Sequence, residues 1–208
     1  MTNNKTNIQK LTLGAILTAL VILLQLMGSF IRFGPFSVSL VLIPIVIGAA
    51  TCGPYIGAWL GFVFGVAVLL SGDAAAFLAI SVPGTILTVL LKGTLCGLCA
   101  GLVYRLLANF DISLSLKRQS PPANVFTASI NIGVLLAAFV CPIVNTGIFL
   151  LGCAVFFMDT VAQWAGNMNV AAYMFLGLAG GNFLFELSAN LLLSPTVVKL
   201  LHLAKRSK

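Results

Sequence analysis

Two ionisable side chains lie deep inside long apolar segments of this sequence, where charged groups are rare. Counted from the start of its segment at 1.5 Å per residue, Lys92 lies ~15 Å deep and Glu186 ~20 Å deep. Because an unpaired charge at the centre of a bilayer costs roughly 2.5–3.5 kcal/mol, both side chains must face away from lipid. They are expected either to form a buried ion pair or to contact a bound substrate.

Uncharged polar side chains occur in the same segments. Asn182, Glu186 and Asn190 are spaced four residues apart and form one polar stripe along a helix. Such groups either hold helices together through interhelical hydrogen bonds or converge on a pocket for a small molecule. Trp164, in a polar stretch between two apolar segments, is placed to cover such a pocket. The other polar side chains of this kind are Thr85, Thr88, Asn145 and Thr146.

The residue inventory does not favour an enzyme. The only histidine, His202, is close to the C-terminus, and no serine or cysteine has a base at a matching depth. No glycine-rich phosphate-binding loop is present, so the chain is not expected to bind ATP itself. One histidine and four acidic residues supply no ordinary ligand set for a metal ion, so neither a metal nor a cofactor is expected.

The elements that position these groups must be membrane-spanning helices. Of the 208 residues, 60% are hydrophobic and 7% charged, whereas roughly 25% are charged in a soluble domain. A span needs about 20 apolar residues, so this composition supports about six spans. The net charge of +7 lies in loops and tails, so no nucleic-acid partner is expected. We predict an all-α integral protein of the cell membrane, in which a six-helix bundle forms one domain over residues 1–208.

Breaks in the apolar pattern set the expected helix boundaries. Gly53-Pro54 divides a long uncharged run into two short helices, Pro83 suits a first helical turn, and Cys141-Pro142 predicts a kink or a break. Residues 156–170 are polar and are expected to form a long outer loop, with room for a helical turn. The six predicted helices run over about 11–31, 38–51, 55–70, 83–107, 124–151 and 172–201.

Positive charges predict the orientation of these helices. Of the eleven Lys and Arg residues, nine fall on the predicted cytoplasmic side, in the two tails, in the loop after the fourth helix or in the helix ends beside them, and the other two are Arg32 and Lys92. Arg32 is in the first outer loop and Lys92 is within the membrane. Since Lys and Arg accumulate in cytoplasmic loops, both termini are predicted to be cytoplasmic.

Small residues predict where helices approach closely. Two rows of three glycines, each repeating every four residues, lie on the third and fourth predicted helices: Gly57, Gly61 and Gly65, then Gly93, Gly97 and Gly101. Both rows are expected to make ordinary contacts within the chain. Ala15 and Ala19 form a similar pair on the first helix, which suits either packing within the chain or a helix from another subunit.

These motifs are distributed over essentially the whole chain. They are Gly14-Ala15 with Ala19, residues 43–48 (IPIVIG), residues 53–58 (GPYIGA) with Gly61 and Gly65, Lys92-Gly93 with Gly97 and Gly101, and finally Asn182, Glu186, Asn190 and Pro195. In this order and spacing, the chain resembles the substrate-binding S components of energy-coupling factor vitamin transporters. The resemblance is strongest to the group that contains pantothenate and folate carriers.

The resemblance implies a six-helix binding protein that holds a vitamin near its outer face and releases it when the domain topples in the membrane. It also implies two ATP-binding cassette subunits and a membrane coupling subunit, which contacts the face at Ala15 and Ala19. Lys92 suits a carboxylate, so pantothenate is the first candidate within the class of vitamins and their precursors. The predicted substrate-binding residues are Arg32, Thr88, Lys92, Asn145, Thr146, Trp164, Asn182 and Glu186, and the predicted partner-binding residues are Ala15 and Ala19.

A second hypothesis comes from a different functional class. The polar stripe would also suit a non-transporting structural or assembly protein of the membrane, in which it only holds the bundle together. A small molecule that co-purifies with the protein would separate the two hypotheses.

The charge distribution leads to a topology prediction. Single cysteines placed at positions 73 and 159 of a cysteine-free variant should react with a membrane-impermeant thiol reagent from the outside, and cysteines near either terminus only from the cytoplasm. Reaction at position 159 from the cytoplasmic side alone would show that the six-span arrangement is wrong.

Overall fold

The computed structural model describes residues 2–28, 32–33, 36–37, 40–117 and 123–206. Helices account for nearly all of this part of the chain, as expected. The helices are α1 (Thr2–Gly28), α2 (Leu42–Cys52), α3 (Pro54–Ser71), α4 (Ala75–Leu78), α5 (Val82–Lys117), α6 (Ala123–Phe156), α7 (Met158–Ala165), α8 (Val170–Ala172), the π-helix η1 (Tyr173–Gly180) and α9 (Gly181–Arg206).

Most predicted breaks fall where helices end. Gly53, with φ of 105°, separates α2 from α3, and Pro54 is the first residue of α3, where its missing N–H leaves no hydrogen bond unmade. Pro83 lies in the first turn of α5, as predicted. The predicted outer loop at 156–170 contains the eight-residue α7. Asn169 then begins the last helical segment, because its side chain accepts hydrogen bonds from the backbone N–H groups of Ala171 and Ala172.

Several helix boundaries differ from the predicted ones. Helix α5 continues to Lys117 rather than ending near 107, and α6 ends at Phe156 rather than 151. The predicted ends followed the thickness of a membrane, whereas a helix continues past the hydrocarbon region until the chain breaks it. Helix α6 runs through Pro142 without interruption. The second helix begins at Leu42 rather than near 38, since Leu40 and Val41 lie before it. The predicted end of the first helix at 31 lies outside the described residues.

A short pair of strands was not predicted. Strands β1 (Arg32–Phe33) and β2 (Phe36–Ser37) pair in antiparallel register, with Arg32 opposite Ser37 and Phe33 opposite Phe36. They lie in the first predicted outer loop, so the fold is all-helical except for this two-residue pairing.

Five helical segments are long and apolar enough to cross a membrane. The sixth expected span, α2, has 11 residues, which at 1.5 Å per residue covers only about half of a ~30 Å hydrocarbon core. The number of six spans therefore stays a prediction. The five long segments are Ile8–Gly28, Pro54–Ser71, Val82–Leu107, Ile132–Phe156 and Val170–Pro195.

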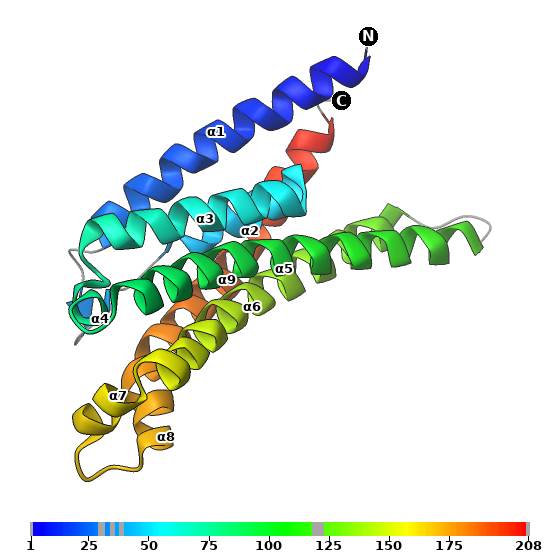
Figure 1. Ribbon diagram of the computed structural model, residues 1–208. Coiled ribbons are helices and arrows are strands. Elements are labelled where there is room, and N and C mark those ends of the chain that lie inside the picture. Colours follow the sequence, from blue (N-terminus) through cyan, green and yellow to red (C-terminus); the bar gives the residue numbers. More distant parts are fainter. Residues whose placement is uncertain (1, 29–31, 34–35, 38–39, 118–122, 207–208) are drawn as a thin grey trace.

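The short helix α2 forms the centre of the bundle. Leu42 and Ile45 are fully buried, and Val46 is nearly so. Helix α2 contacts α1, α3, α5, α6 and α9, and in Figure 1 it lies behind α3 and α5. A helix that is surrounded by other helices does not need to match the thickness of the lipid layer by itself.

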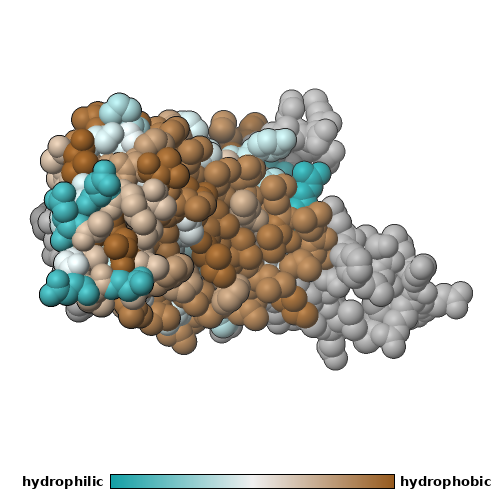
Figure 2. Space-filling view, turned by 60° about the horizontal axis from the view of Figure 1, so that its bottom comes forward, coloured by the Kyte–Doolittle hydropathy of each residue, from teal (hydrophilic) through white to brown (hydrophobic). Residues whose placement is uncertain are grey.

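The two ends of the bundle differ. The N and C termini lie at the same end in Figure 1, and α4, α7 and α8 lie at the opposite end. A chain that crosses a membrane an even number of times has both termini on the same side. Between the two ends, the surface in Figure 2 is mostly hydrophobic, as a surface in contact with lipid must be.

The two glycine rows face each other across the contact between α3 and α5. A Cβ atom on Gly61 would collide with the carbonyl oxygen of Gly93, and one on Gly97 would collide with that of Gly57. On Gly65, a Cβ would lie 2.9 Å from the carbonyl oxygen of Val89. The expected close helix contacts are therefore confirmed, and they join the two rows to each other.

This contact leads to a stability prediction. Gly61→Ala should lower the free energy of unfolding by about 1–3 kcal/mol, because the new methyl group meets backbone atoms that cannot move aside. Gly147→Ala is the matched control, because Gly147 lies within α6 and a Cβ there would meet nothing within 4 Å. That change should be neutral or stabilising by roughly 0.5–1 kcal/mol. Thermal unfolding of both variants in detergent measures the difference, and equal midpoints would contradict the prediction.

Candidate functional site: a polar cavity within the helix bundle

Glu186 of α9 is buried, with 1% of its surface exposed. Its carboxylate accepts hydrogen bonds from two side-chain amides. Asn145 of α6 donates to Oε2 over 3.4 Å, and Asn182, one turn earlier on α9, donates to Oε1 over 3.3 Å. Asn190 donates instead to the backbone oxygen of Glu186 over 2.8 Å. The predicted polar stripe thus becomes a network that joins α6 to α9.

Lys92 of α5 is held by aromatic rings. Its ammonium nitrogen lies 5.7 Å from the centre of the Phe64 ring and 5.4 Å from that of Phe149. Cation–π contacts of this kind contribute from about 0.5 to 2 kcal/mol, depending on how dry the site is. Lys92 and Glu186 both have described side chains, and no nitrogen–oxygen contact within 4.0 Å joins them. The direct ion pair that the sequence allowed is therefore not formed.

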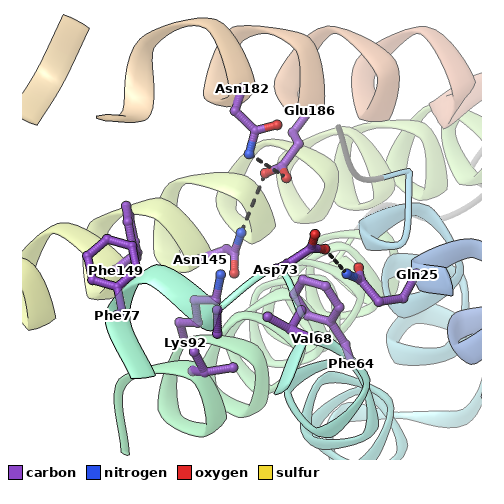
Figure 3. Close-up of a pocket in the computed structure, with 12 residues that line it drawn as sticks. Gln25, Phe64, Val68, Asp73, Phe77, Lys92, Asn145, Phe149, Asn182 and Glu186 are labelled. Atoms are coloured by element: carbon purple, nitrogen blue, oxygen red, sulfur yellow. Dashed lines mark hydrogen bonds between the residues drawn. The ribbon is translucent and has the colours of Figure 1, made fainter. Parts of the chain in front are cut away.

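Lys92 and Glu186 both line a cavity of about 80 Å³. Figure 3 shows Lys92, Asn145, Asn182 and Glu186 around it, with Gln25 and Asp73 on one side. A second cavity of about 50 Å³ shares Lys92 and both asparagines with the first. The first cavity alone is large enough to hold water molecules. Its other lining residues are Phe64, Val68, Ala74, Phe77, Val89 and Phe149.

Two polar atoms at this site lack a partner among the described residues. Each asparagine uses its amide nitrogen on Glu186, and the Oδ1 atoms of Asn145 and Asn182 are buried without a hydrogen bond. Leaving a buried acceptor unsatisfied costs about 1–3 kcal/mol. These oxygens therefore favour a molecule in the cavity that donates hydrogen bonds to them.

One side of the cavity joins α1 to the loop after α3. Gln25 of α1 donates a hydrogen bond to Asp73 over 2.6 Å and contacts Ser71 over 3.3 Å. Gln25 was not singled out from the sequence, although an amide within an apolar run could have identified it. The aromatic wall was also missed, because a phenylalanine in a span is indistinguishable from ordinary packing.

A cluster of rings adjoins the cavity wall at Phe77 of α4. The Phe77 ring lies 5.6 Å from Phe149, 5.1 Å from Phe157 and 5.6 Å from Trp164, each in an edge-to-face arrangement. Trp164 of α7 thus contacts a wall residue without lining either cavity itself. This contact places α7 beside the cavity.

The structure brings together five of the eight predicted substrate-binding residues. Lys92, Asn145 and Asn182 line both cavities, Glu186 lines the first, and Thr146 lines the second. Thr88 lines neither, because its side chain packs against Gly152 of α6, and its hydroxyl oxygen has no partner in the described part of the chain. The side chain of Arg32 lies outside the described residues.

The predicted partner-binding residues have a different environment. The buried face of α1 includes Leu17, Val21 and Gln25, whereas Ala15 and Ala19 are exposed. Only 22% of the residues in the apolar window of α1 are buried. The small pair on α1 therefore makes no close helix contact of the kind seen between α3 and α5.

Within the described residues, no three His, Cys, Asp or Glu side chains gather in a way that could hold a metal ion. The chemistry that the cavity supports is reversible recognition: a cation between two rings, a carboxylate, two free amide acceptors and an apolar wall.

Comparison with known proteins gives one match. Residues 9–198 match the family model described as ECF transporter, substrate-specific component. No curated protein and no solved structure matches the chain.

Proposed function

Because the chain belongs to the substrate-specific component family of ECF transporters, we propose that it captures a vitamin or vitamin precursor in the cavity beside Lys92. Members of this family are substrate-binding subunits that work with an ECF module of membrane and ATPase subunits. The chain is accordingly a multi-pass protein of the cell membrane. ATP hydrolysis is assigned to the partner subunits.

The observation that supports the proposed site is the pair of unsatisfied amide oxygens on Asn145 and Asn182. A polar network that only held the bundle together would be expected to satisfy its own buried groups, with Lys92 paired to Glu186. Here the ammonium and the carboxylate remain apart, and both line the cavity. That arrangement favours a binding site over a structural or assembly role.

The location of the cavity fits uptake from outside. Phe77 on its wall belongs to α4, which lies at the end of the bundle opposite to both termini. If the termini are cytoplasmic, as the positive charges predict, this end faces the exterior. A substrate would then reach the cavity between α4, α7 and the loop that carries Asp73.

Substitutions in the cavity test the proposed function. Lys92→Met and Asn182→Leu should each weaken binding of the molecule that co-purifies with the wild-type protein, once mass spectrometry has identified it. Losing a hydrogen bond to a charged group costs about 1.5–3 kcal/mol, which corresponds to roughly 10- to 150-fold in affinity. Titration calorimetry of the purified variants measures the change.

Asn190→Leu is the matched control for this experiment. It removes an amide from the same stripe of α9, but Asn190 lines neither cavity. Its affinity should stay within about threefold of the wild-type value. Wild-type affinity in folded Lys92→Met and Asn182→Leu variants, or the absence of any bound small molecule, would favour the structural role.

We further propose that the exposed pair Ala15 and Ala19 forms the contact with the membrane subunit of the module. Small side chains allow another helix to approach the backbone of α1 closely. Both residues are exposed in the isolated chain, so this surface is available to a partner.

Large substitutions on α1 test this contact. Ala15→Trp or Ala19→Trp should prevent co-purification of the module and abolish uptake, while substrate affinity of the isolated chain stays unchanged. Leu20→Trp is the control, because it adds the same ring to an exposed position one residue from Ala19, about 100° around the helix. Normal assembly and uptake in both alanine variants would remove this surface from the interface.

A further inference from the structure

Three side-chain amides line the cavity, and each of them donates a hydrogen bond to a carboxylate. Gln25 donates to Asp73 over 2.6 Å. Asn145 and Asn182 donate to Glu186, one to each carboxylate oxygen, over 3.4 Å and 3.3 Å. The amides come from three different helices, α1, α6 and α9, and yet all three direct their nitrogen atoms to an acidic side chain.

This pairing fixes which end of each amide faces the remaining space. The oxygen and nitrogen of an amide are nearly alike in shape, so in a neutral pocket the group can rotate by 180° and exchange them. Beside a carboxylate it cannot, because the rotation would replace an N–H donor by an oxygen that repels the carboxylate. Asp73 and Glu186 therefore hold the three amides with their oxygens turned away from the acidic groups.

The amide oxygens are left to accept hydrogen bonds from another molecule. Among the described residues, the Oδ1 atoms of Asn145 and Asn182 are buried without a donor. For Gln25, both hydrogen bonds of the side chain are donated by its nitrogen, to Asp73 and Ser71. The amides of the cavity thus act as acceptors.

We infer that the substrate donates hydrogen bonds here, through N–H or O–H groups that face the oxygens of Asn145 and Asn182. Asp73 and Glu186 are positioning residues, which act on the substrate through the amides that they orient. In Figure 3 the oxygen of Asn145 lies on the side of the amide that faces Lys92. The inference rests on the proposed function and narrows the substrate to molecules with at least two such donors, such as primary amides, ureas, amino-substituted rings and alcohols.

The energetic reason is the cost of a buried acceptor that has no partner. A donor on the substrate satisfies an amide oxygen, whereas a methyl group of similar size leaves it unsatisfied. A site built to hydrogen-bond a substrate N–H or O–H group rejects an analogue without that group strongly, because its own polar atoms are then left unpaired. Loss of one donor should therefore weaken binding by about 5- to 150-fold.

Pairs of compounds that differ in a donor test the inference on the full chain purified in detergent. They are nicotinamide with 3-acetylpyridine and pyridoxine with 4-deoxypyridoxine, in which the second member lacks a donor and keeps the same net charge. The molecule that co-purifies is identified by mass spectrometry and compared with its derivative methylated at the N–H and alcoholic O–H groups. Calorimetry measures each affinity.

The expected result has two parts. The co-purified molecule carries at least two N–H or O–H groups and binds at least about fivefold more tightly than its methylated derivative. Any named pair that binds shows the same preference for the member with the donor. Because the two members of a named pair carry the same charge, this comparison does not depend on the charge of the cavity lining.

Glu186→Gln supplies a readout that a purely structural role would not change. The new amide accepts a hydrogen bond from one asparagine and donates one to the other, which is then free to rotate and turn its nitrogen toward the substrate. The preference for the donor member should fall to about twofold or less. Because both members bind the same preparation, their affinity ratio does not depend on the fraction of folded protein.

A second variant and a control complete the test. Asp73→Asn makes the same change beside Gln25 and should also lower the ratio, so it decides the outcome if Glu186→Gln binds no compound. Asn190→Leu should keep the wild-type ratio, because Asn190 lines neither cavity.

Three results would overturn the inference and leave the proposed function in place. They are a co-purified molecule with fewer than two donors, a preference below about fivefold in the wild-type protein, and a wild-type ratio in every variant that binds. If nothing co-purifies and none of the named compounds binds, the inference and the proposed function both fail.

Discussion

The contact between the backbones of α3 and α5 determines the geometry of the site. Side chains larger than hydrogen at Gly61 or Gly93 would separate the two helices, because carbonyl groups occupy the space that a Cβ atom would need. Lys92 precedes Gly93, and Phe64 precedes Gly65. The glycines therefore set the distance of 5.7 Å between the ammonium and the Phe64 ring. The position of a substrate-binding side chain inside the membrane therefore depends on the helix contact beside it.

The sequence predicts the polar part of the site better than its apolar part. Lys92, Asn145, Asn182 and Glu186 are identifiable because polar groups in apolar spans must face inward. Phe64 and Phe149 have no comparable signal, since their role depends on where Lys92 points after the helices pack. Thr88 shows that a polar side chain in an apolar span can also be assigned to the site wrongly. It lies one helical turn before Lys92, which suggests a shared face, yet it packs against Gly152 of α6.

Helix boundaries that have a local backbone signal follow from the sequence more closely than the other boundaries do. The break at Gly53-Pro54 and the start of α5 depend on local backbone chemistry, so they are found where expected. The ends of α5 and α6 depend on how far a helix extends into water, which the thickness of a membrane does not determine. The shortness of α2 depends on its burial among the other helices. Only the assembled bundle shows that this segment is shielded from lipid.

The opposite charges of Lys92 and Glu186 have a consequence for the effect of an electric field on the protein. Moving one elementary charge through 100 mV requires about 2.3 kcal/mol. Lys92 and Glu186 line the same cavity, so a rearrangement that moves the cavity relative to the membrane carries both charges together. Their contributions to the electrical work then oppose each other. The contribution of this pair to any dependence of substrate binding on the membrane voltage would therefore be small.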